Sequence, residues 1–413
     1  MRAVIIAVGS EMLNQERLDT NSIYLSRRLR EKGILTDMKL VVGDNRDYLA
    51  WAVRQACKRA QLVVTIGGLG PTADDLTREA VAEALRREMT YNEEIVEQIR
   101  ERFRRMGMQM PEINTRQAFV IEGAEVLPNP VGTAPGLFLD IEPCRVLLLP
   151  GPPRELQPMF DAVLENRIGP LSRYHVCSRT MRIAGLTESE ADTRLTAALG
   201  RIDNLDVTIL ASPGLIEIHL MGRSRKEKTE AEEAVAIAVE RVRNEFVSHL
   251  VTELDESFAA AVLRRLQEKK LTLAVAESCT GGRLADCLTD VPGSSAVFLG
   301  GVIAYDNALK RDFLGVSPQT MTRWGAVSAQ TAAEMARGVR EKTGADIAVS
   351  ITGIAGPGGG SREKPVGLVF FHLHSADCDQ DSRRLMNGNR DSIKTRSVNH
   401  ALNMIREYLD GRE

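Results

Sequence analysis

Short apolar runs alternate with amphipathic segments along most of this 413-residue chain. The runs AVIIAVG (residues 3–9), LVVTIGG (62–68) and LTLAVAES (271–278) are each the length of a buried strand. Segments with apolar residues at helical spacing stand between such runs, for example TNSIYLSRRLREKG (20–33). This alternation is typical of mostly parallel sheets that are covered by helices on both faces. It therefore predicts an α/β fold.

The pattern changes twice, which predicts two α/β domains with mostly parallel sheets, joined by a small α+β module. We expect the first α/β domain over 1–168, the module over 175–250 and the second α/β domain over 255–413. In the module we expect two or three strands and two helices, and a role as a spacer or subunit contact. A KH-like RNA-binding role is the alternative, but GLTE (185–188) lacks the GxxG clamp that such a role needs.

Composition narrows the functional classes. The net charge is −3 and aromatic residues make up 4%, so nucleic acid is not an expected partner. The six cysteines are scattered without a CxxC pair, as expected for free thiols in a cytoplasmic protein. The first apolar run is too short for an export signal or a membrane span, so no membrane association is expected.

Four loops of the last domain follow predicted strands or begin helices, where parallel sheets bind ligands. In ESCTGG (277–282), Ser278 is a candidate nucleophile beside Cys279, although it could simply cap the next helix. In GGVIAYDNALKRDFLG (300–315), Lys310 could act as the base for a serine, or could be an ordinary surface lysine.

The other two loops offer anion-binding groups. SITGIAGPGGGSREKPVG (350–367) could form an anion-holding nest with Thr352 at its mouth, or a flexible hairpin. Arg390 and Arg396 flank a helix start and could hold a phosphate, or form surface ion pairs. His372 and His374 share a strand face and could bind a metal, but no third ligand is evident nearby, so packing is the favoured interpretation.

Residues 255–410 closely resemble the CinA C-terminal domain, the nicotinamide-mononucleotide deamidase family. The matching stretches, in order, are AESCTGG, PGSS, GGVIAYDNALKRDFLGV, GAVS, SITGIAGPGGG and KPVGLV. The resemblance implies hydrolysis of nicotinamide mononucleotide to nicotinate mononucleotide and ammonia, without a metal or other cofactor. It implies that Ser278 is the nucleophile and that Tyr305 and Lys310 assist it. The substrate-binding residues that it implies are Thr280, Gly281, Ser295, Thr352, Gly353 and an arginine, Arg390 or Arg396.

The first domain resembles the molybdopterin-binding fold at the front of full-length CinA proteins. The matching stretches are VGSEML, DTNS, TIGGLGPTADDLTREA, NPVGTAPG and LLLPGPPREL; Asn14 departs from the pattern, where a glycine is usual. The resemblance implies metal-dependent hydrolysis of the ADP-ribose pyrophosphate. Backbone amides in the loop can cradle a pyrophosphate, and Asp74 and Asp75 can hold a divalent cation, Mg²⁺ or Co²⁺. The residues expected to line this loop are Gly67, Gly68, Gly70 and Thr72.

Together these features predict a bifunctional hydrolase of pyridine-nucleotide salvage, acting on nicotinamide mononucleotide and ADP-ribose, and forming a homodimer. The alternative is a molybdopterin- or nucleotide-binding scaffold of competence or DNA repair whose C-terminal domain is inert. Fold alone also allows molybdopterin handling by the first domain. A capped turn with exposed carboxylates is the alternative explanation of Asp74 and Asp75, but the matching stretch is too long and specific for us to prefer it.

Overall fold

The computed structural model describes residues 1–14 and 18–411 and divides into two compact units. The first unit comprises residues 1–177 and 223–231, and the second comprises 178–222 and 232–413. No helix in the described part of the chain is both long and apolar enough to cross a membrane.

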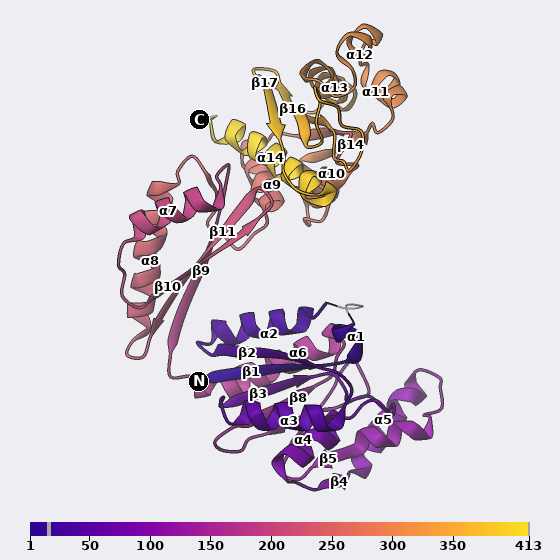
Figure 1. Ribbon diagram of the computed structural model, residues 1–413, viewed down its shortest axis with the longest axis vertical. Helices are drawn as coiled ribbons and strands as arrows, with labels where there is room; N and C mark the ends of the chain where they lie inside the picture. Colours follow the sequence, from indigo (N-terminus) through magenta and orange to yellow (C-terminus); the bar gives the residue numbers. More distant parts are fainter. Residues whose placement is uncertain (15–17, 412–413) are drawn as a thin grey trace. The chain divides into compact units, whose positions relative to one another are not determined.

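A six-stranded sheet forms the centre of the first unit, in the order β2-β1-β3-β8-β7-β6 (Figure 1). The first four strands of this order are parallel, and β7 and β6 add antiparallel pairs at one edge. The strands are β1 (Arg2–Val8), β2 (Leu35–Val42), β3 (Leu62–Ile66), β6 (Glu125–Leu127), β7 (Gly136–Leu139) and β8 (Arg145–Leu149). A separate antiparallel pair is formed by β4 (Met89–Tyr91) and β5 (Phe119–Ile121).

Both faces of this sheet are apolar because successive strand residues point to opposite faces. Ile5 and Val64 pack with α2 (Thr20–Glu31) and α6 (Pro153–Val163), whereas Ile6 and Val63 pack with α3 (Arg46–Cys57) and α4 (Thr77–Leu85). The sheet is thus the middle of three layers. The remaining helical segments of this domain are α1 (Ser10–Leu13), α5 (Glu93–Arg105), η1 (Glu112–Ala118), η2 (Leu164–Ile168) and η3 (Gly169–Leu171).

The strand order places a topological switch point between β1 and β3. The chain leaves β1 for β2 on one side and continues to β3 on the other. In open parallel sheets, ligands bind in the crevice outside the carboxyl ends of the strands at such a point. This crevice is where the glycine-rich loop after β3 begins.

The α+β module has four strands, one more than the upper limit expected from the sequence. Its sheet has the order β10-β11-β9-β12, and the short β12 pairs with β9 after the last helix. Met181, Ile218 and Leu195 belong to the core between this sheet and its helices. The elements are β9 (His175–Ala184), α7 (Glu188–Leu199), β10 (Leu205–Ser212), β11 (Leu215–Ser224), α8 (Lys228–Glu245) and β12 (Leu250–Thr252).

The C-terminal domain is a second three-layer α/β structure with sheet order β14-β13-β15-β16-β17. Strands β14, β13 and β15 are parallel, while β16 and β17 are antiparallel additions. The strands are β13 (Leu273–Glu277), β14 (Phe298–Ile303), β15 (Ile347–Gly353), β16 (Leu368–Ser375) and β17 (Asp379–Leu385). The expected α/β class is confirmed, with antiparallel strands at the edges of both larger sheets.

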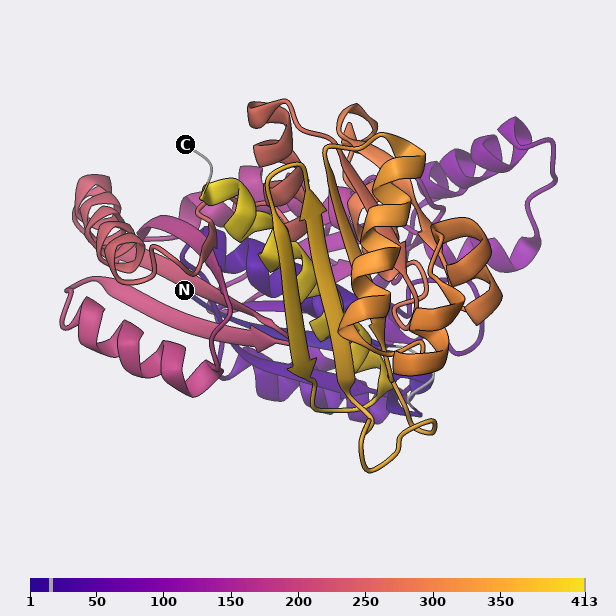
Figure 2. The ribbon, with the colours of Figure 1, turned by 90° about the horizontal axis from the view of Figure 1, so that it is seen from above.

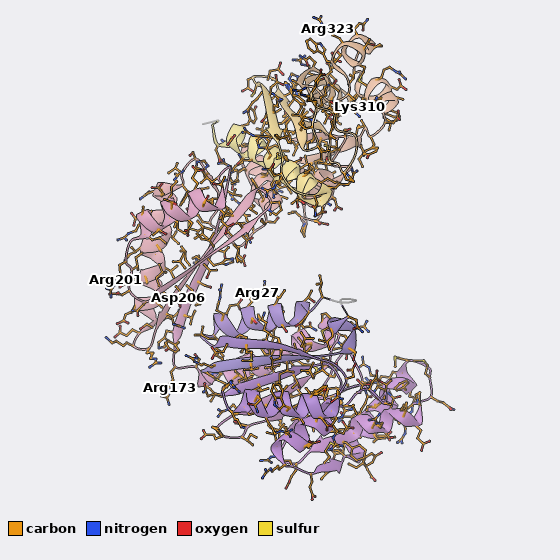
Figure 3. The ribbon with its side chains drawn as sticks, in the orientation of Figure 1. Arg27, Arg173, Arg201, Asp206, Lys310 and Arg323 are labelled. Carbon is orange, nitrogen blue, oxygen red and sulfur yellow. The ribbon has the colours of Figure 1, made fainter. Side chains whose placement is uncertain are left out.

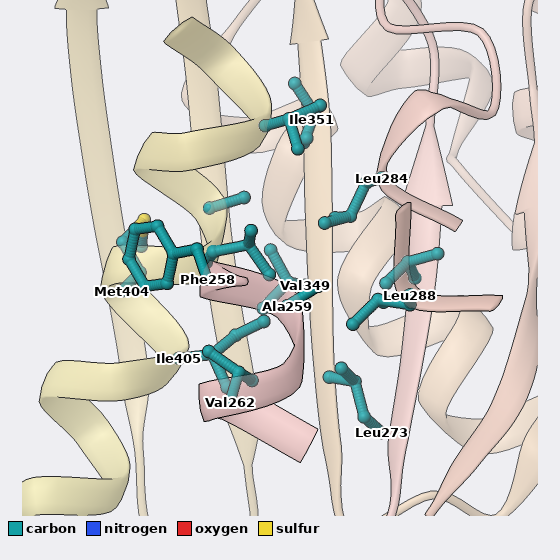
Figure 4. Close-up of a cluster of buried hydrophobic side chains, with 14 of the residues drawn as sticks. Phe258, Ala259, Val262, Leu273, Leu284, Leu288, Val349, Ile351, Met404 and Ile405 are labelled. Carbon is teal, nitrogen blue, oxygen red and sulfur yellow. The ribbon is translucent and has the colours of Figure 1, made fainter. Parts of the chain in front are cut away.

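Two helical layers enclose this second sheet. On one face, side chains of α9, α10 and α14, among them Phe258, Leu284 and Met404, pack on Val349 and Ile351 (Figure 4). On the other face, α13 lies beside β16 and β17 (Figure 2). The helices are α9 (Phe258–Lys269), α10 (Arg283–Thr289), η4 (Ser294–Ala296), α11 (Asn307–Leu314), α12 (Pro318–Trp324), α13 (Ala329–Thr343) and α14 (Arg390–Asp410).

Candidate functional site

The turn after β13 is organised by Glu277, whose carboxylate is buried at the start of α10. One oxygen accepts hydrogen bonds from the amides of Gly282 and Leu284, at 3.0 and 3.1 Å, and the other accepts from Ala285 at 2.8 Å. A helix N-terminus carries unpaired amides that favour a negative charge. Because Glu277 supplies that charge, these three amides are not available to a phosphate. The sequence did not reveal this internal cap.

Ser278 follows Glu277 and lies where the chain turns away from the sheet. Its backbone amide donates to Ile351 O at 2.9 Å, and its carbonyl accepts from the amide of Gly281 at 3.1 Å. Among residues 1–14 and 18–411, no other residue hydrogen-bonds the Ser278 hydroxyl or the amides of Cys279 and Thr280, although the Cys279 amide lies against its own thiol. A hydroxyl without a partner beside two unengaged amides is an arrangement suited to nucleophilic attack with oxyanion stabilisation.

Cys279 is a poor nucleophile in this position. Its thiol is buried, and desolvation raises its pKa to about 12. The thiolate is the reactive form of cysteine, so almost none is present near neutral pH. The environment of the turn therefore favours Ser278 over its neighbour.

Lys310 is fully buried on α11, with 1% of its surface exposed, and is labelled in Figure 3. Its Nζ donates to Ala304 O at 2.7 Å and to Tyr305 O at 3.2 Å, at the end of β14. The Ala304 amide in turn donates to Glu277 O, next to Ser278. Desolvation lowers the pKa of Lys310, and the nearby Asp306 carboxylate acts in the opposite direction. The structure thus excludes an ordinary surface lysine.

Tyr305 and Arg390 meet at the same edge of the sheet. Arg390 Nη2 donates to the Tyr305 hydroxyl at 3.2 Å, and Arg390 Nη1 donates to Gly356 O in the glycine-rich loop at 2.6 Å. The side chain of Tyr305 is largely exposed. These contacts bring together the segment after β14, the start of α14 and the loop after β15.

Two of the expected substrate-binding residues are committed to the protein interior. The hydroxyl of Thr352 donates to Ala326 O at 2.7 Å, and a side chain at Gly353 would press against Leu368 and Val369. Both residues therefore shape the end of β15.

Two further expected substrate-binding residues, Thr280 and Gly281, lie in the Ser278 turn. Thr280 is buried and its hydroxyl has no partner in the described chain, and Gly281 has a φ of +63°. A Cβ on Gly281 would lie 3.7 Å from Lys394 Nζ, so an ammonium group stands beside the turn. Lys394 was not identified from the sequence; its position one helical turn after Arg390 is the signal that could have revealed it.

Ser295 and Arg396 are not brought to this group of residues. Ser295 precedes β14, whereas Ser278 follows β13. Because these strands are parallel, Ser295 lies at their amino ends and Ser278 at their carboxyl ends. The separation is about 17 Å, the length of a five-residue strand. Arg396 lies against Gly214 of the α+β module, so Arg390 is the arginine that the structure places at the site.

The first domain has its own cavity, of about 650 Å³, at the switch point of its sheet. The loops after β1, β2, β3 and β8 all contribute to its lining, with Gly9, Asp44, Gly67 and Gly151 among the residues. Asn14, which departs from the family pattern, is not among the described residues that line it and has a φ of −85°, which any residue adopts.

The glycine-rich loop after β3 is held from inside the domain. Arg78 is buried and donates to Leu69 O at 2.9 Å and to Gly70 O at 3.0 Å. Gly68 has a φ of +65°, and a side chain there would collide with Thr77. Desolvation lowers the pKa of Arg78, but a guanidinium stays charged at neutral pH. A fixed positive charge thus lies beneath the loop, where it favours an anionic ligand.

Asp74 and Asp75 have different surroundings. Asp75 Oδ2 accepts hydrogen bonds from the Thr72 amide, at 2.9 Å, and from the Thr72 hydroxyl, so this pair holds the loop closed. Both aspartates line the cavity, and Asp74 is exposed. Among the described residues they do not join a third histidine, cysteine or acidic ligand in one compact group. A cation here would need oxygen atoms from the ligand as well.

The two histidines of β16 are not simply packed among apolar groups. Asp379 of β17 lies close enough to His372 and His374 for the three side chains to hold one ion. The sequence offered no sign of this third group, because the strand that carries Asp379 was not predicted.

The fold defines an α/β protein in which each larger domain carries a candidate site at the carboxyl ends of its parallel strands. Three family models match the chain: residues 4–169 match "Probable molybdopterin binding domain", 178–251 match "Damage-inducible protein CinA KH domain", and 255–409 match "CinA C-terminal domain". A CinA-like protein of Solibacter usitatus is 42% identical, covering 100% of this chain and 99% of its own length. A CinA-like protein of Thermotoga maritima is 40% identical over 100% and 99%. The chain belongs to the CinA family.

Solved structures include similar proteins that correspond to part of the chain. A competence/damage inducible protein from Agrobacterium tumefaciens is 42% identical, covering 38% of this chain and 99% of its own, with a TM-score of 0.35. CinA from Thermoplasma acidophilum is 31% identical, covering 40% and 98%, with a TM-score of 0.38.

Proposed function

We propose that the C-terminal domain hydrolyses nicotinamide mononucleotide to nicotinate mononucleotide and ammonia. The observation that carries this proposal is the turn at Ser278, where an unpartnered hydroxyl adjoins unengaged amides and the strand end that holds buried Lys310. The resemblance of the surrounding sequence to the deamidase family supplies the substrate. The proposed reaction uses side chains and water alone.

In this mechanism Ser278 Oγ attacks the carboxamide carbon while Lys310 accepts the hydroxyl proton. The amides of Cys279 and Thr280 stabilise the oxyanion of the tetrahedral intermediate. Lys310 returns the proton to the amide nitrogen, and the C–N bond breaks. The nitrogen leaves as ammonia, and the acyl group remains as an ester on Ser278. Water then cleaves the ester, so nicotinate mononucleotide is released and the serine is restored.

The phosphate of the substrate requires a positive site at a distance from the reacting amide. Arg390 and Lys394 lie on the first turns of α14, next to Tyr305 and Gly281 respectively. A guanidinium binds phosphate in a bidentate manner, and an ammonium adds charge without that geometry. We therefore assign phosphate binding to Arg390, assisted by Lys394.

The test compares Ser278→Ala with Cys279→Ala in full-length protein, with ammonia release from nicotinamide mononucleotide as the assay. Ser278→Ala should abolish ammonia release, whereas Cys279→Ala should keep much of it, because the thiol is protonated and buried. Thermal melts of both variants control for folding. If the serine variant remains active and the cysteine variant is inactive, Cys279 is the nucleophile. If the unaltered protein releases no ammonia, the scaffold hypothesis is favoured.

We also propose that the first domain hydrolyses the pyrophosphate of ADP-ribose with a divalent cation, Mg²⁺ or Co²⁺. The supporting observation is the cavity at the switch point, which combines a glycine-rich loop over Arg78 with the carboxylates of Asp74 and Asp75. Mg²⁺ is commonly held by one or two carboxylates together with substrate phosphates, so this pair fits such an ion. The cation would neutralise charge that develops on the pyrophosphate.

Asp74 and Asp75 would hold the cation, with Asp75 using Oδ1 because Thr72 engages Oδ2. The loop amides and Arg78 would orient the pyrophosphate. We further propose that the protein acts in the cytoplasm as a homodimer, without nucleic acid or a membrane as a partner.

A further inference from the structure

An unassigned cluster of imidazole and carboxylate groups lies between the last two strands of the C-terminal sheet. His372 and His374 alternate on β16 and therefore point to the same face. In the antiparallel register they stand directly opposite Asp381 and Asp379 of β17. The face is the one beside α13 (Figure 2), whose Arg337 donates to Asp379 Oδ2 at 2.7 Å.

Three atoms that could bind a metal lie close together: His372 Nε2, His374 Nδ1 and Asp379 Oδ1. His372 Nε2 lies 2.5 Å from Asp379 Oδ1, and His374 Nδ1 lies 3.2 Å from the same oxygen. One ligand atom of each residue lies within 4.8 Å of the others. In a tetrahedral zinc site with bonds near 2.0 Å, neighbouring ligand atoms are about 3.3 Å apart. The two separations from Asp379 Oδ1, 2.5 and 3.2 Å, are each within about 1 Å of that spacing.

His372 also has a carboxylate behind it. Its Nδ1 lies 2.7 Å from Asp381 Oδ1, so Nε2 is the nitrogen that faces Asp379 and His374. Histidines that bind metals almost always donate their other ring nitrogen to such a carboxylate or to a carbonyl, which fixes the ring orientation. The His372 side chain is 3% exposed, whereas Asp379 is exposed. The cluster is therefore buried at His372 and open to solvent at Asp379.

We propose that His372, His374 and Asp379 bind a divalent transition-metal ion of the Zn²⁺ class, with Asp381 orienting His372. Two imidazole nitrogens and one carboxylate suit Zn²⁺, Co²⁺ or Ni²⁺ and do not suit Mg²⁺ or Ca²⁺, which prefer oxygen ligands. Three protein ligands leave a fourth position for water.

This site is separate from the proposed deamidase site. His374 pairs with Ala348 near the start of β15, whereas Thr352 lies four residues further along, about 13 Å away. The bound ion would fasten the polar edge strand β17 to β16. The proposal therefore does not depend on the enzymatic activity of the domain.

The experiment uses chelator-treated, full-length protein without a histidine tag, titrated with Co²⁺ alone. A low-coordinate site with two imidazoles gives an intense visible absorption, whereas octahedral oxygen ligation at Asp74 and Asp75 gives a weak one. We expect an intense visible band that saturates at one equivalent of Co²⁺ and disappears when Zn²⁺ displaces the Co²⁺. Zn²⁺ should also raise the melting temperature of the C-terminal domain.

Two ligand variants and two controls complete the test. His374→Ala and Asp379→Asn should each remove the band and weaken Zn²⁺ binding by at least tenfold. Asp74→Asn should keep the band, as should His400→Gln, which alters a histidine packed on Phe371 against the opposite face. The proposal is overturned if the unaltered protein gives no intense band, or if the band survives in both ligand variants. In that event the cluster is an ion-pair network only.

Discussion

A buried lysine with two carbonyl partners is suited to the neutral amine. The two N–H groups of a neutral Lys310 can donate to Ala304 O and Tyr305 O, which leaves the lone pair free. An ammonium at the same place would have a third donor to satisfy, and burial already disfavours its charge. The environment is thus suited to a general base.

Replacing this lysine should lower turnover and leave the fold intact. We expect Lys310→Met, which has similar length and no charge, to reduce the kcat for ammonia release by about two or more decades. Steady-state assays on purified variant, with circular dichroism as the folding control, provide the measurement. A near-normal kcat would remove Lys310 from the mechanism.

The pH dependence of the reaction should report the same residue. The active form is the neutral amine, so kcat should fall as pH drops below the pKa of Lys310, by up to tenfold per pH unit. Because desolvation lowers this pKa from 10.5, the plateau should begin at a lower pH than for an exposed lysine. The kcat–pH profile measures this. An identical acid limb in the residual activity of Lys310→Met would assign the limb to another group.

At the scale of elements, Glu277 determines how α10 begins. The N-cap residue, Gly282, has no side chain to accept a hydrogen bond from the first helical amides or to supply a negative charge. The Glu277 carboxylate does both. The helix then packs Leu284 and Leu288 into the core beneath the sheet (Figure 4). Loss of the carboxylate would leave three buried or half-buried amides unpaired.

Glu277→Ala should therefore destabilise the C-terminal domain by about 2–4 kcal/mol, since hydrogen bonds to a charged group contribute about 1.5–3 kcal/mol each and are not additive. Urea unfolding followed by Trp324 fluorescence, in a Trp51→Phe background, isolates this domain. Asp286→Asn, an exposed acid on the same helix, is the matched control and should change stability by less than about 0.5 kcal/mol. Equal midpoints for the two variants would show that Glu277 is not an essential cap.

Elements that obey hydrophobic periodicity were predictable, and those that depend on their neighbours were not. The central strands β1, β3 and β13 read as apolar runs because both of their faces are covered. The edge strand β17, with the polar sequence DQDSRRL, carries no such signal, and its pairing to β16 becomes visible only in the folded sheet. Ser278 and Lys310 stood in recognisable motifs, whereas Glu277, Arg78 and Lys394 act through contacts that spacing alone does not encode.

At the scale of the whole molecule, the two proposed reactions occupy separate sheets with separate cores. The first-domain cavity and the Ser278 turn share no residue and belong to different compact units. Substitutions at sites without shared partners usually act independently. The activities should therefore respond to different treatments.

Chelation of the metal and substitution of single residues should each affect only one of the two proposed activities. EDTA should stop ADP-ribose cleavage while ammonia release persists in the same sample. Asp74→Asn should lower cleavage by at least tenfold and leave ammonia release within about twofold, and Ser278→Ala should do the reverse. Asp74 is the better probe because it is exposed, whereas Asp75 also accepts a hydrogen bond from the Thr72 amide. Equal loss of both activities in EDTA would show that the metal has been assigned to the wrong reaction.

The tight packing of the loop after β3 affects how a mutational scan of this protein would be read. Gly68 has a φ of +65° and no room for a side chain because of Thr77, whereas a side chain at Gly70 would have to displace the Asp75 carboxylate. Almost every replacement at these positions would disturb the loop before any ligand arrived. Inactive variants at Gly68 would report backbone strain and collision with Thr77, so intolerance to substitution at Gly68 could not be used to map the ligand.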